Sequence, residues 1–81
     1  MKKALLIWKR PGDPARQATR CLWQVDADTY LVTSSVKFLG ISETMTFPAD
    51  ALGEVTDWCE LGVAGYNDHE GALLVAGYEV G

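Results

Sequence analysis

The chain has 81 residues, of which 48% are hydrophobic and 22% charged, and its formal net charge is −4. This length fits a single domain over residues 1–81, and the composition is typical of a globular protein and not of a disordered one. The acidic balance disfavours direct binding to nucleic acid, because neutralising phosphates requires cationic side chains.

The apolar runs are too short to direct export or to cross a membrane. The N-terminal run from Ala4 to Trp8 has five residues, whereas the apolar region of a signal peptide needs about 7–15. The run from Ala72 to Ala76 is far shorter than the ~20 residues that span a bilayer. We therefore expect a cytoplasmic protein without a membrane-spanning segment.

The first part of the chain predicts two strands on either side of a proline-rich loop. Residues 4–10 alternate in part and predict a strand with Leu6 and Trp8 on one face. Residues 11–18 begin with Pro-Gly-Asp-Pro and predict a loop. Residues 19–25 predict a second strand. The apolar residues of this second strand that share a face are Cys21, Trp23 and Val25.

Two further strands are predicted at residues 29–36, where β-branched residues are frequent, and at residues 43–47. The shorter strand alternates, which predicts that Met45 and Phe47 point inward and that its two threonines point outward. Pro48 is expected to end this strand, because proline has no N–H group to donate to a neighbouring strand.

Residues 49–60 allow two interpretations. Val55, Trp58 and Leu61 are spaced three residues apart, which fits either one short helical turn or a bent segment laid on the core. The sequence does not decide between them.

The C-terminal part predicts one short helix. Asn67 fits an N-cap with Glu70 three residues later, an apolar run follows at residues 72–76, and Gly77 fits the glycine after a helix. Residues 78–80 could add a final short strand. The predicted fold class is α+β: a mostly antiparallel sheet of about four strands with one short C-terminal helix packed on one face.

The sequence shows no catalytic motif, that is, no set of residue types common in active sites at a characteristic spacing. His69 is the only histidine, and we expect it to be exposed at the start of the helix, because no nucleophile of matching spacing accompanies it. Cys21 and Cys59 form no C-x-x-C motif, and we expect both to be small core residues and not a disulfide. The sequence thus predicts no enzyme, no metal site and no cofactor.

A peptide motif of low specificity lies in residues 17–23. Gln17 and the pair Leu22-Trp23 occupy the places of the first and last conserved residues in the clamp-binding peptide of bacterial replication proteins, although Arg20 stands where an aliphatic residue is preferred. The remote alternative is therefore a ligand of the replication sliding clamp. We favour the interpretation that this segment is a core strand.

Charges are separated along the chain. All seven basic residues lie in the first 40 positions, and eight of the eleven acidic residues lie in the last 41. Two outcomes of folding fit this pattern: the two signs are interleaved on the surface, or an acidic face remains that docks on a basic partner surface. Trp58 lies within the acidic stretch and fits either an interface anchor or a core position. The candidate partner-binding residues are Asp50, Glu54, Asp57, Trp58 and Glu60.

The C-terminal half carries a pattern of three short motifs. They are Phe-Pro-Ala-Asp at residues 47–50, Gly-Glu-Val-Thr-Asp-Trp at residues 53–58 and Asp-His-Glu at residues 68–70. Over residues 43–78 the chain resembles small uncharacterised accessory proteins encoded by bacteriophages and prophages of actinobacteria. The resemblance implies phage origin, the host-cell cytoplasm and an accessory role, and it implies no particular reaction.

Two functional hypotheses follow. The first is a non-catalytic phage accessory protein that binds a host or phage protein through an acidic and aromatic surface, in host takeover, inhibition or counter-defence. The alternative is a structural or self-associating protein, because one helix can cover only one face of the sheet and the other face, or a strand edge, could pair with a second copy in a homodimer.

Overall fold

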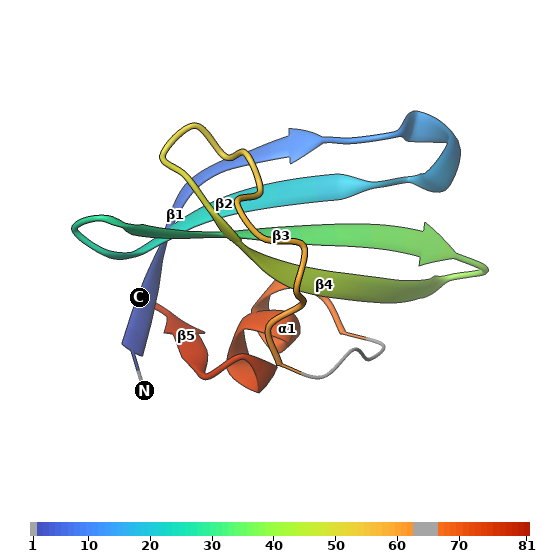
Figure 1. The fold of residues 1–81 in the computed structure, drawn as a ribbon. Coiled ribbons are helices and arrows are strands. Elements are labelled where there is room, and N and C mark those ends of the chain that lie inside the picture. The colour runs from blue at the N-terminus through green and yellow to red at the C-terminus, as the bar shows by residue number, and fades with distance from the viewer. Residues whose placement is uncertain (1, 63–66) are drawn as a thin grey trace.

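The computed structural model describes residues 2–62 and 67–81, which form one curled sheet with one α-helix (Figure 1). The described elements are β1 (Lys2–Pro11), a 3-10 helix η1 (Pro14–Arg16), β2 (Thr19–Asp26), β3 (Thr29–Phe38), β4 (Ile41–Ala49), α1 (His69–Val75) and β5 (Tyr78–Val80). The order of the strands across the sheet is β4-β3-β2-β1-β5. The fold is α+β as predicted, but the described sheet has five strands where about four were expected.

The last strand makes the sheet mixed. β1, β2, β3 and β4 are successive antiparallel neighbours, as the sequence predicted. β5 instead lies parallel to the N-terminal end of β1, with Lys2 opposite Tyr78 and Ala4 opposite Val80. Parallel neighbours need a long connection, and the connection between β1 and β5 comprises β2, β3, β4 and α1.

β1 contributes side chains to both faces through a β-bulge at Ile7. Leu6 is opposite Trp23, whereas Trp8 is opposite Leu22, so the register shifts between Leu6 and Trp8. One extra residue in a strand reverses the alternation of side chains beyond it. The prediction that Leu6 and Trp8 share a face is therefore wrong: Leu6 lies on the side of α1, and Trp8 lies on the opposite side.

The main core lies between the sheet and α1. Its buried residues are Ala4, Cys21, Trp23, Leu31 and Leu73, with Val25, Leu61 and Tyr78 packed against them. The predicted shared face of β2 is thereby confirmed. A helix of seven residues does not persist alone in water, so the burial of Leu73 against the strands, worth about 1.5–3 kcal/mol for a side chain of this size, holds α1 in place.

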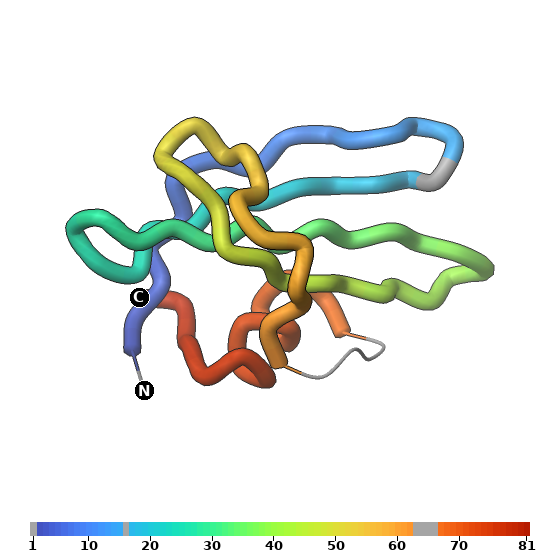
Figure 2. The backbone as a smooth tube through the Cα atoms, viewed as in Figure 1, coloured from blue at the N-terminus to red at the C-terminus, as the bar shows by residue number. Residues whose placement is uncertain are grey.

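The opposite face of the sheet is covered in part by a loop. Residues 50–59 contain no helix and fold back across the strands (Figure 2). A Cβ atom on Gly53 would lie 2.4 Å from Cζ2 of Trp8, so this glycine is in direct contact with the indole ring. Of the two interpretations of this stretch, the bent segment laid on the core is the correct one. The buried residues on this face are Leu22, Val32 and Phe47.

β4 departs from its predicted orientation in two ways. Thr44 and Thr46 are buried on the side of α1, and Met45 is exposed, so these three predictions are wrong; Phe47 is buried as predicted. The hydroxyl of Thr44 donates to the backbone carbonyl of Asn67 at 2.6 Å. A buried hydroxyl is tolerated when it has such a partner, and this partner lies 23 residues away in the sequence.

α1 begins one residue later than the sequence predicted. Its N-cap is Asp68, whose Oδ1 accepts a hydrogen bond from the amide of Gly71 at 2.8 Å, and not Asn67. At the other end Gly77 has φ = 97° and follows the C-cap Ala76, as predicted. Within the described residues no helix is long and apolar enough to cross a membrane.

Candidate functional site

Residues 50–61, which we call the cover segment, are fastened to the outer edge of β4 by backbone hydrogen bonds. The amide of Thr56 donates to the carbonyl of Pro48 at 3.0 Å, and the amide of Leu61 donates to the carbonyl of Thr46 at 2.8 Å. β4 therefore continues past Pro48, which does not end the strand as predicted. At a sheet edge the missing N–H of proline costs little.

Two carboxylates of the cover segment fix its shape. Oδ1 of Asp50 accepts hydrogen bonds from the amides of Leu52 at 2.9 Å and Glu54 at 3.0 Å. Oδ1 of Asp57 accepts from the amide of Cys59 at 2.9 Å, and this bond holds the pKa of Asp57 below its ordinary value. The segment is thus a hydrogen-bonded loop that carries negative charge at neutral pH.

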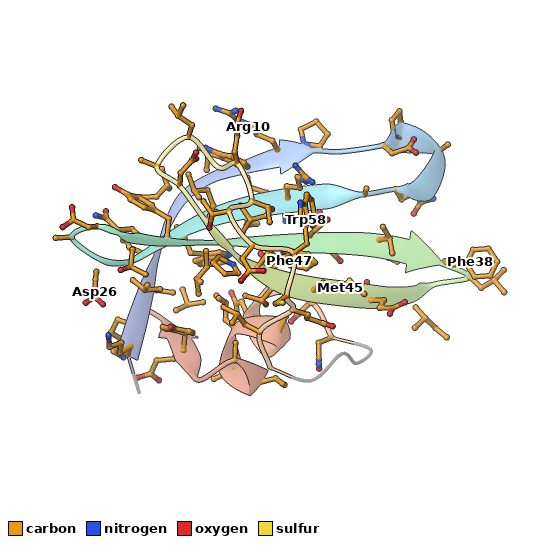
Figure 3. The ribbon with its side chains drawn as sticks, in the orientation of Figure 1. Arg10, Asp26, Phe38, Met45, Phe47 and Trp58 are labelled. Carbon is orange, nitrogen blue, oxygen red and sulfur yellow. The ribbon has the colours of Figure 1, made fainter. Side chains whose placement is uncertain are left out.

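Trp58 is held on the outside of the cover segment. Its side chain is 69% exposed, and its ring packs edge-on against Phe47, with the ring centroids 5.2 Å apart and an interplanar angle of 65° (Figure 3). Trp58 therefore contacts the core with one edge and leaves the rest of the indole free. An aromatic side chain held in this way loses little conformational freedom when a partner covers it.

All five predicted binding residues lie on the cover segment. Glu54 is exposed like Trp58, Glu60 is half-buried, and Asp50 and Asp57 combine their charge with the structural hydrogen bonds described above. The structure thus places these residues on one segment, which packs on the face opposite α1 at Gly53 and Trp58 and reaches the core beneath α1 at Leu61.

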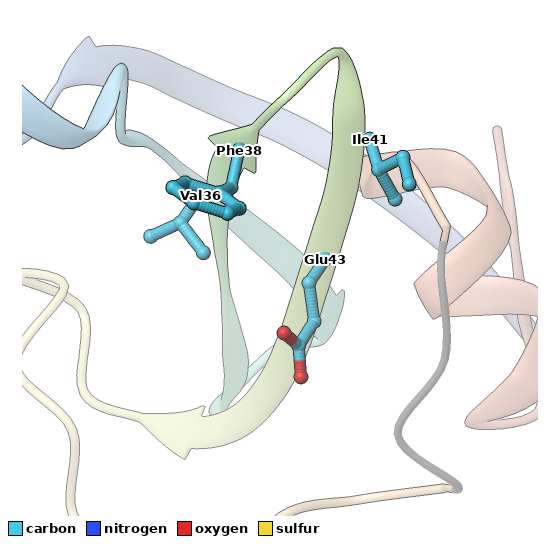
Figure 4. A pocket seen from close by; sticks show the side chains of 4 residues that line it. All are labelled: Val36, Phe38, Ile41 and Glu43. Carbon is cyan, nitrogen blue, oxygen red and sulfur yellow. The ribbon is translucent and has the colours of Figure 1, made fainter.

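The remainder of this face, which we call the bare half, is not covered by that segment. Strand register aligns the residues in rows across the sheet. The covered row consists of Trp8, Leu22, Val32 and Phe47. The next row, which begins the bare half, consists of Arg10, Arg20, Ser34 and Met45. The bare half ends in a hollow of about 260 Å³ lined by Val36, Phe38, Ile41 and Glu43 (Figure 4).

The bare half carries two arginines beside apolar side chains, together with the carboxylates of Glu43 and Asp13. Arg10 and Arg20 lie directly opposite each other on β1 and β2, and the Arg10 guanidinium lies 4.2 Å from the ring centroid of Trp8. Within the described residues the salt bridges are made by Lys2 and Lys3 at the other end of β1, so neither arginine forms one. Like charges opposite each other on neighbouring strands repel, and a carboxylate from outside would relieve that repulsion.

The tip of the β3–β4 hairpin exposes large apolar side chains beside this hollow. Phe38 is 76% exposed and Leu39 is 85% exposed. Leu39 and Gly40 have φ values of 51° and 79°, which matches a tight hairpin turn in which asparagine normally precedes glycine. The sequence predicted a turn here but gave no sign that it borders a hollow in the sheet face.

His69 is half-buried, so the prediction of an exposed residue at the helix start is wrong. Its Nε2 lies 2.7 Å from Oγ1 of Thr19, and its Nδ1 lies 2.7 Å from Oγ1 of Thr33. The indole N–H of Trp23 donates to the same Thr33 oxygen at 2.9 Å. Because a hydroxyl can donate or accept, a neutral imidazole satisfies both contacts in either tautomer. His69 thus ties α1 to β2 and β3.

Several groups set the protonation of His69. Burial lowers its pKa most, the positive charge of Lys9 lowers it further, and Asp68 opposes both effects. The imidazole is therefore neutral at pH 7. Lys9, Glu70 and Cys21 line the same open hollow of about 210 Å³ as His69. Both ring nitrogens already have hydroxyl partners, which suits a structural tie between the helix and the sheet.

The two cysteines differ in their surroundings. Cys21 is buried in the core as predicted, whereas Cys59 is exposed on the cover segment and the prediction for it is wrong; both are free thiols. Burial raises the pKa of Cys21, and the neighbouring Asp57 raises the pKa of Cys59. Among residues 2–62 and 67–81, no three His, Cys, Asp or Glu side chains gather in a way that could hold a metal ion.

The peptide motif at residues 17–23 is not available to a binding groove. Leu22 is fully buried and Trp23 is buried beside it, in a strand that has neighbours on both sides. The interpretation of this segment as a core strand is therefore confirmed, and the clamp-ligand alternative would require Leu22 and Trp23 to leave the core.

No protein-family model, curated protein or solved structure matches the chain.

Proposed function

We propose that this protein is a non-catalytic accessory protein that acts by binding another protein through its half-covered sheet face. In this proposal Trp58 is the anchor, and Asp50, Glu54, Asp57 and Glu60 supply the charge that steers and orients the partner. The partner is a protein and not a nucleic acid, because the surface around the anchor is negative.

The observation that carries the proposal is the state of Trp58. It is the most exposed tryptophan of the described chain, yet it is not a free side chain, because its ring rests on Phe47 and its loop is hydrogen-bonded to β4. Tryptophan in such a position is the residue type that most often dominates binding energy at protein interfaces.

The biological setting in this proposal comes from the resemblance over residues 43–78. The resemblance implies that the chain comes from an actinobacterial phage or prophage, and we propose that it acts in the host-cell cytoplasm on a host or phage protein, in takeover, inhibition or counter-defence. The absence of catalysis in the proposal is supported by His69, whose two ring nitrogens are used to join α1 to the sheet.

The test is capture of a partner from an actinobacterial host lysate, before and after phage infection, with tagged protein. We expect a stoichiometric partner that Trp58→Ala no longer retains. Leu74→Ala is the matched control, because Leu74 is a half-exposed residue of α1 on the other side of the sheet, and this variant should retain the partner. A partner held equally well by the Trp58→Ala variant, or none in any lysate, would overturn the proposal.

A further inference from the structure

We infer that this sheet does not bind partners by strand addition, because both of its edges are closed: the edge of β4 by the cover segment, and the edge of β1 by a β-bulge, a lysine and a proline. An edge strand normally offers its unpaired backbone groups to any extended chain, including a second copy of itself. The inference goes beyond the proposed function, since it concerns the edges of the sheet and not the face that carries Trp58.

The outer edge of β4 has little backbone left to offer. Its even-numbered residues point their backbone groups outward, because the carbonyls of Thr46 and Pro48 accept amides of the cover segment. Thr44, the next outward residue, is 3% exposed, so an added strand does not reach its backbone. Ser42 follows beside the hairpin tip and is half-exposed. One such position is too short for a ladder of backbone hydrogen bonds.

The outer edge of β1 is covered only at its N-terminal end. β5 pairs with residues 2–4, and the amide of Gly81 donates to the carbonyl of Ala4 at 2.9 Å. In the part of the chain that the structure describes, no strand lies on the outer side of residues 6–11. Three large aliphatic side chains, at positions 5–7, are exposed beside this edge. A regular strand of this kind is a template for pairing with another chain.

The β-bulge disturbs the spacing of the outward backbone groups. In a regular strand, residues an even number apart point these groups to the same side. The carbonyl of Ala4 faces β5, whereas the amide of Gly12, which directly follows β1, donates to Ala18 on the side of β2. This reversal places Leu6 and Lys9 outward, three residues apart instead of two. A partner strand whose groups repeat every second residue therefore does not match both positions.

Lys9 and Pro11 limit the rest of this edge. By the same alternation Pro11 is the next outward residue after Lys9, and proline has no N–H group to donate. Lys9 is exposed, so a strand laid here would lie against a charged side chain. A bulge, a lysine and a proline are each known means of protecting an edge strand from pairing. Their occurrence together at the edge that β5 leaves uncovered is the observation that carries the inference.

The closed edges leave side chains as the means of recognition. A partner then meets a face of the sheet and does not extend the sheet, in agreement with an anchor such as Trp58. The same closure argues against a homodimer formed edge to edge, which the sequence alone left open.

The test removes the lysine and the proline and keeps the bulge. Lys9→Val/Pro11→Val gives the edge a further N–H group and two residues that favour strands. In sedimentation equilibrium we expect this variant to associate at an about ten-fold lower concentration than wild type. The matched control is Lys37→Val/Pro48→Val, because Lys37 lies in an inner strand and Pro48 at the covered edge. Far-UV circular dichroism checks folding, and Lys9→Val alone replaces the double variant if that does not fold.

Hydrogen exchange of the Lys9 amide shows which edge is used. We expect rapid exchange in wild type and protection in the associated variant. A wild-type protein whose Lys9 amide becomes protected on association, or on binding a partner from the lysate, overturns the inference. So does a double variant that associates no more than wild type, or a control that associates equally. Loss of the partner in Trp58→Ala concerns the proposed function alone, so the two can fail separately.

Discussion

The contact between Gly53 and Trp8 allows a sharp test of how the cover segment is held. In the variant Gly53→Ala the new Cβ would lie 2.4 Å from Cζ2 of Trp8, a separation that real contacts do not show. Gly53 also has φ = 88°, a conformation that costs an L-residue about 1–2 kcal/mol. The ring of Trp8 is half-buried in the sheet face, so it cannot simply move away.

The magnitude follows from these two costs. Overpacking of a filled site costs about 1–3 kcal/mol, so Gly53→Ala should lower the free energy of unfolding by about 3 kcal/mol in total. A domain of this length has a stability of only about 4–12 kcal/mol, and the loss is therefore a large share of it. The variant should also lift the cover segment and expose the buried Leu22 and Val32.

Urea denaturation followed by far-UV circular dichroism measures the effect, and Gly40→Ala is the matched control. Gly40 has a similar φ of 79°, but a Cβ there would meet nothing within 4 Å, so only the backbone cost of about 1–2 kcal/mol applies. The difference between the two variants isolates the clash with Trp8. If Gly53→Ala were no more destabilising than Gly40→Ala, the cover segment would not be packed on that ring.

Three further predictions concern His69 and the hairpin tip. Thr33→Val should lower the free energy of unfolding by about 2–4 kcal/mol in urea denaturation, because it leaves the indole N–H of Trp23 and Nδ1 of His69 without a partner. The folded pKa of His69 lies below its unfolded value. Its contribution to stability should therefore be complete above about pH 6.5 and be lost as the pH falls through the folded pKa. Urea denaturation from pH 8 to pH 5 should show that the free energy of unfolding decreases with falling pH, and His69→Gln should reduce this pH dependence. Leu39→Asn should raise stability by about 0.5–1 kcal/mol in thermal or urea denaturation, because asparagine before Gly40 suits a positive φ and Leu39 buries little.

Each of these predictions has a contradicting result. A loss below about 1 kcal/mol in Thr33→Val would mean that water replaces the hydroxyl. A His69 imidazole that titrates above its ordinary pKa in an NMR pH series would reverse the sign of the pH dependence. A Leu39→Asn variant that is less stable than wild type would show that Leu39 packs against something at the tip.

The strands were predictable because their residues obey a period of two. Cys21, Trp23 and Val25 share the buried face of β2 as the alternation indicates, and the glycine after α1 marks its end. These signals lie within a few residues of the feature they predict, so no knowledge of the rest of the fold is needed to interpret them.

The incorrect predictions concern residues whose orientation or burial depends on parts of the chain that are distant in the sequence. The bulge at Ile7 inserts one residue into β1 without any signal in the residue types. The sequence therefore could not show that Leu6 and Trp8 lie on opposite faces of the sheet. Thr44 is buried because Asn67 offers a carbonyl, and His69 is buried because Thr19 and Thr33 lie beneath the helix. A polar residue at such a position looks exposed until its partner in space is known.

The candidate site was predictable in part. The acidic stretch and Trp58 were found from charge and residue type, and the structure places them on one segment. The bare half was missed because it is assembled from four separate strands, which bring Arg10, Arg20, Ser34 and Met45 to one face. Only the strand register shows that these residues are neighbours of the cover segment.

The bulge in β1 has a consequence for how the molecule comes apart. On the N-terminal side of the bulge, Ala4 is buried in the core between the sheet and α1. On its C-terminal side, Trp8 contacts Gly53 of the cover segment on the opposite face. β1 therefore contributes to the packing on both faces of the sheet, and loss of packing on one face disturbs the packing on the other. We therefore expect a single cooperative unfolding transition, in which the packing on both faces of the sheet is lost together.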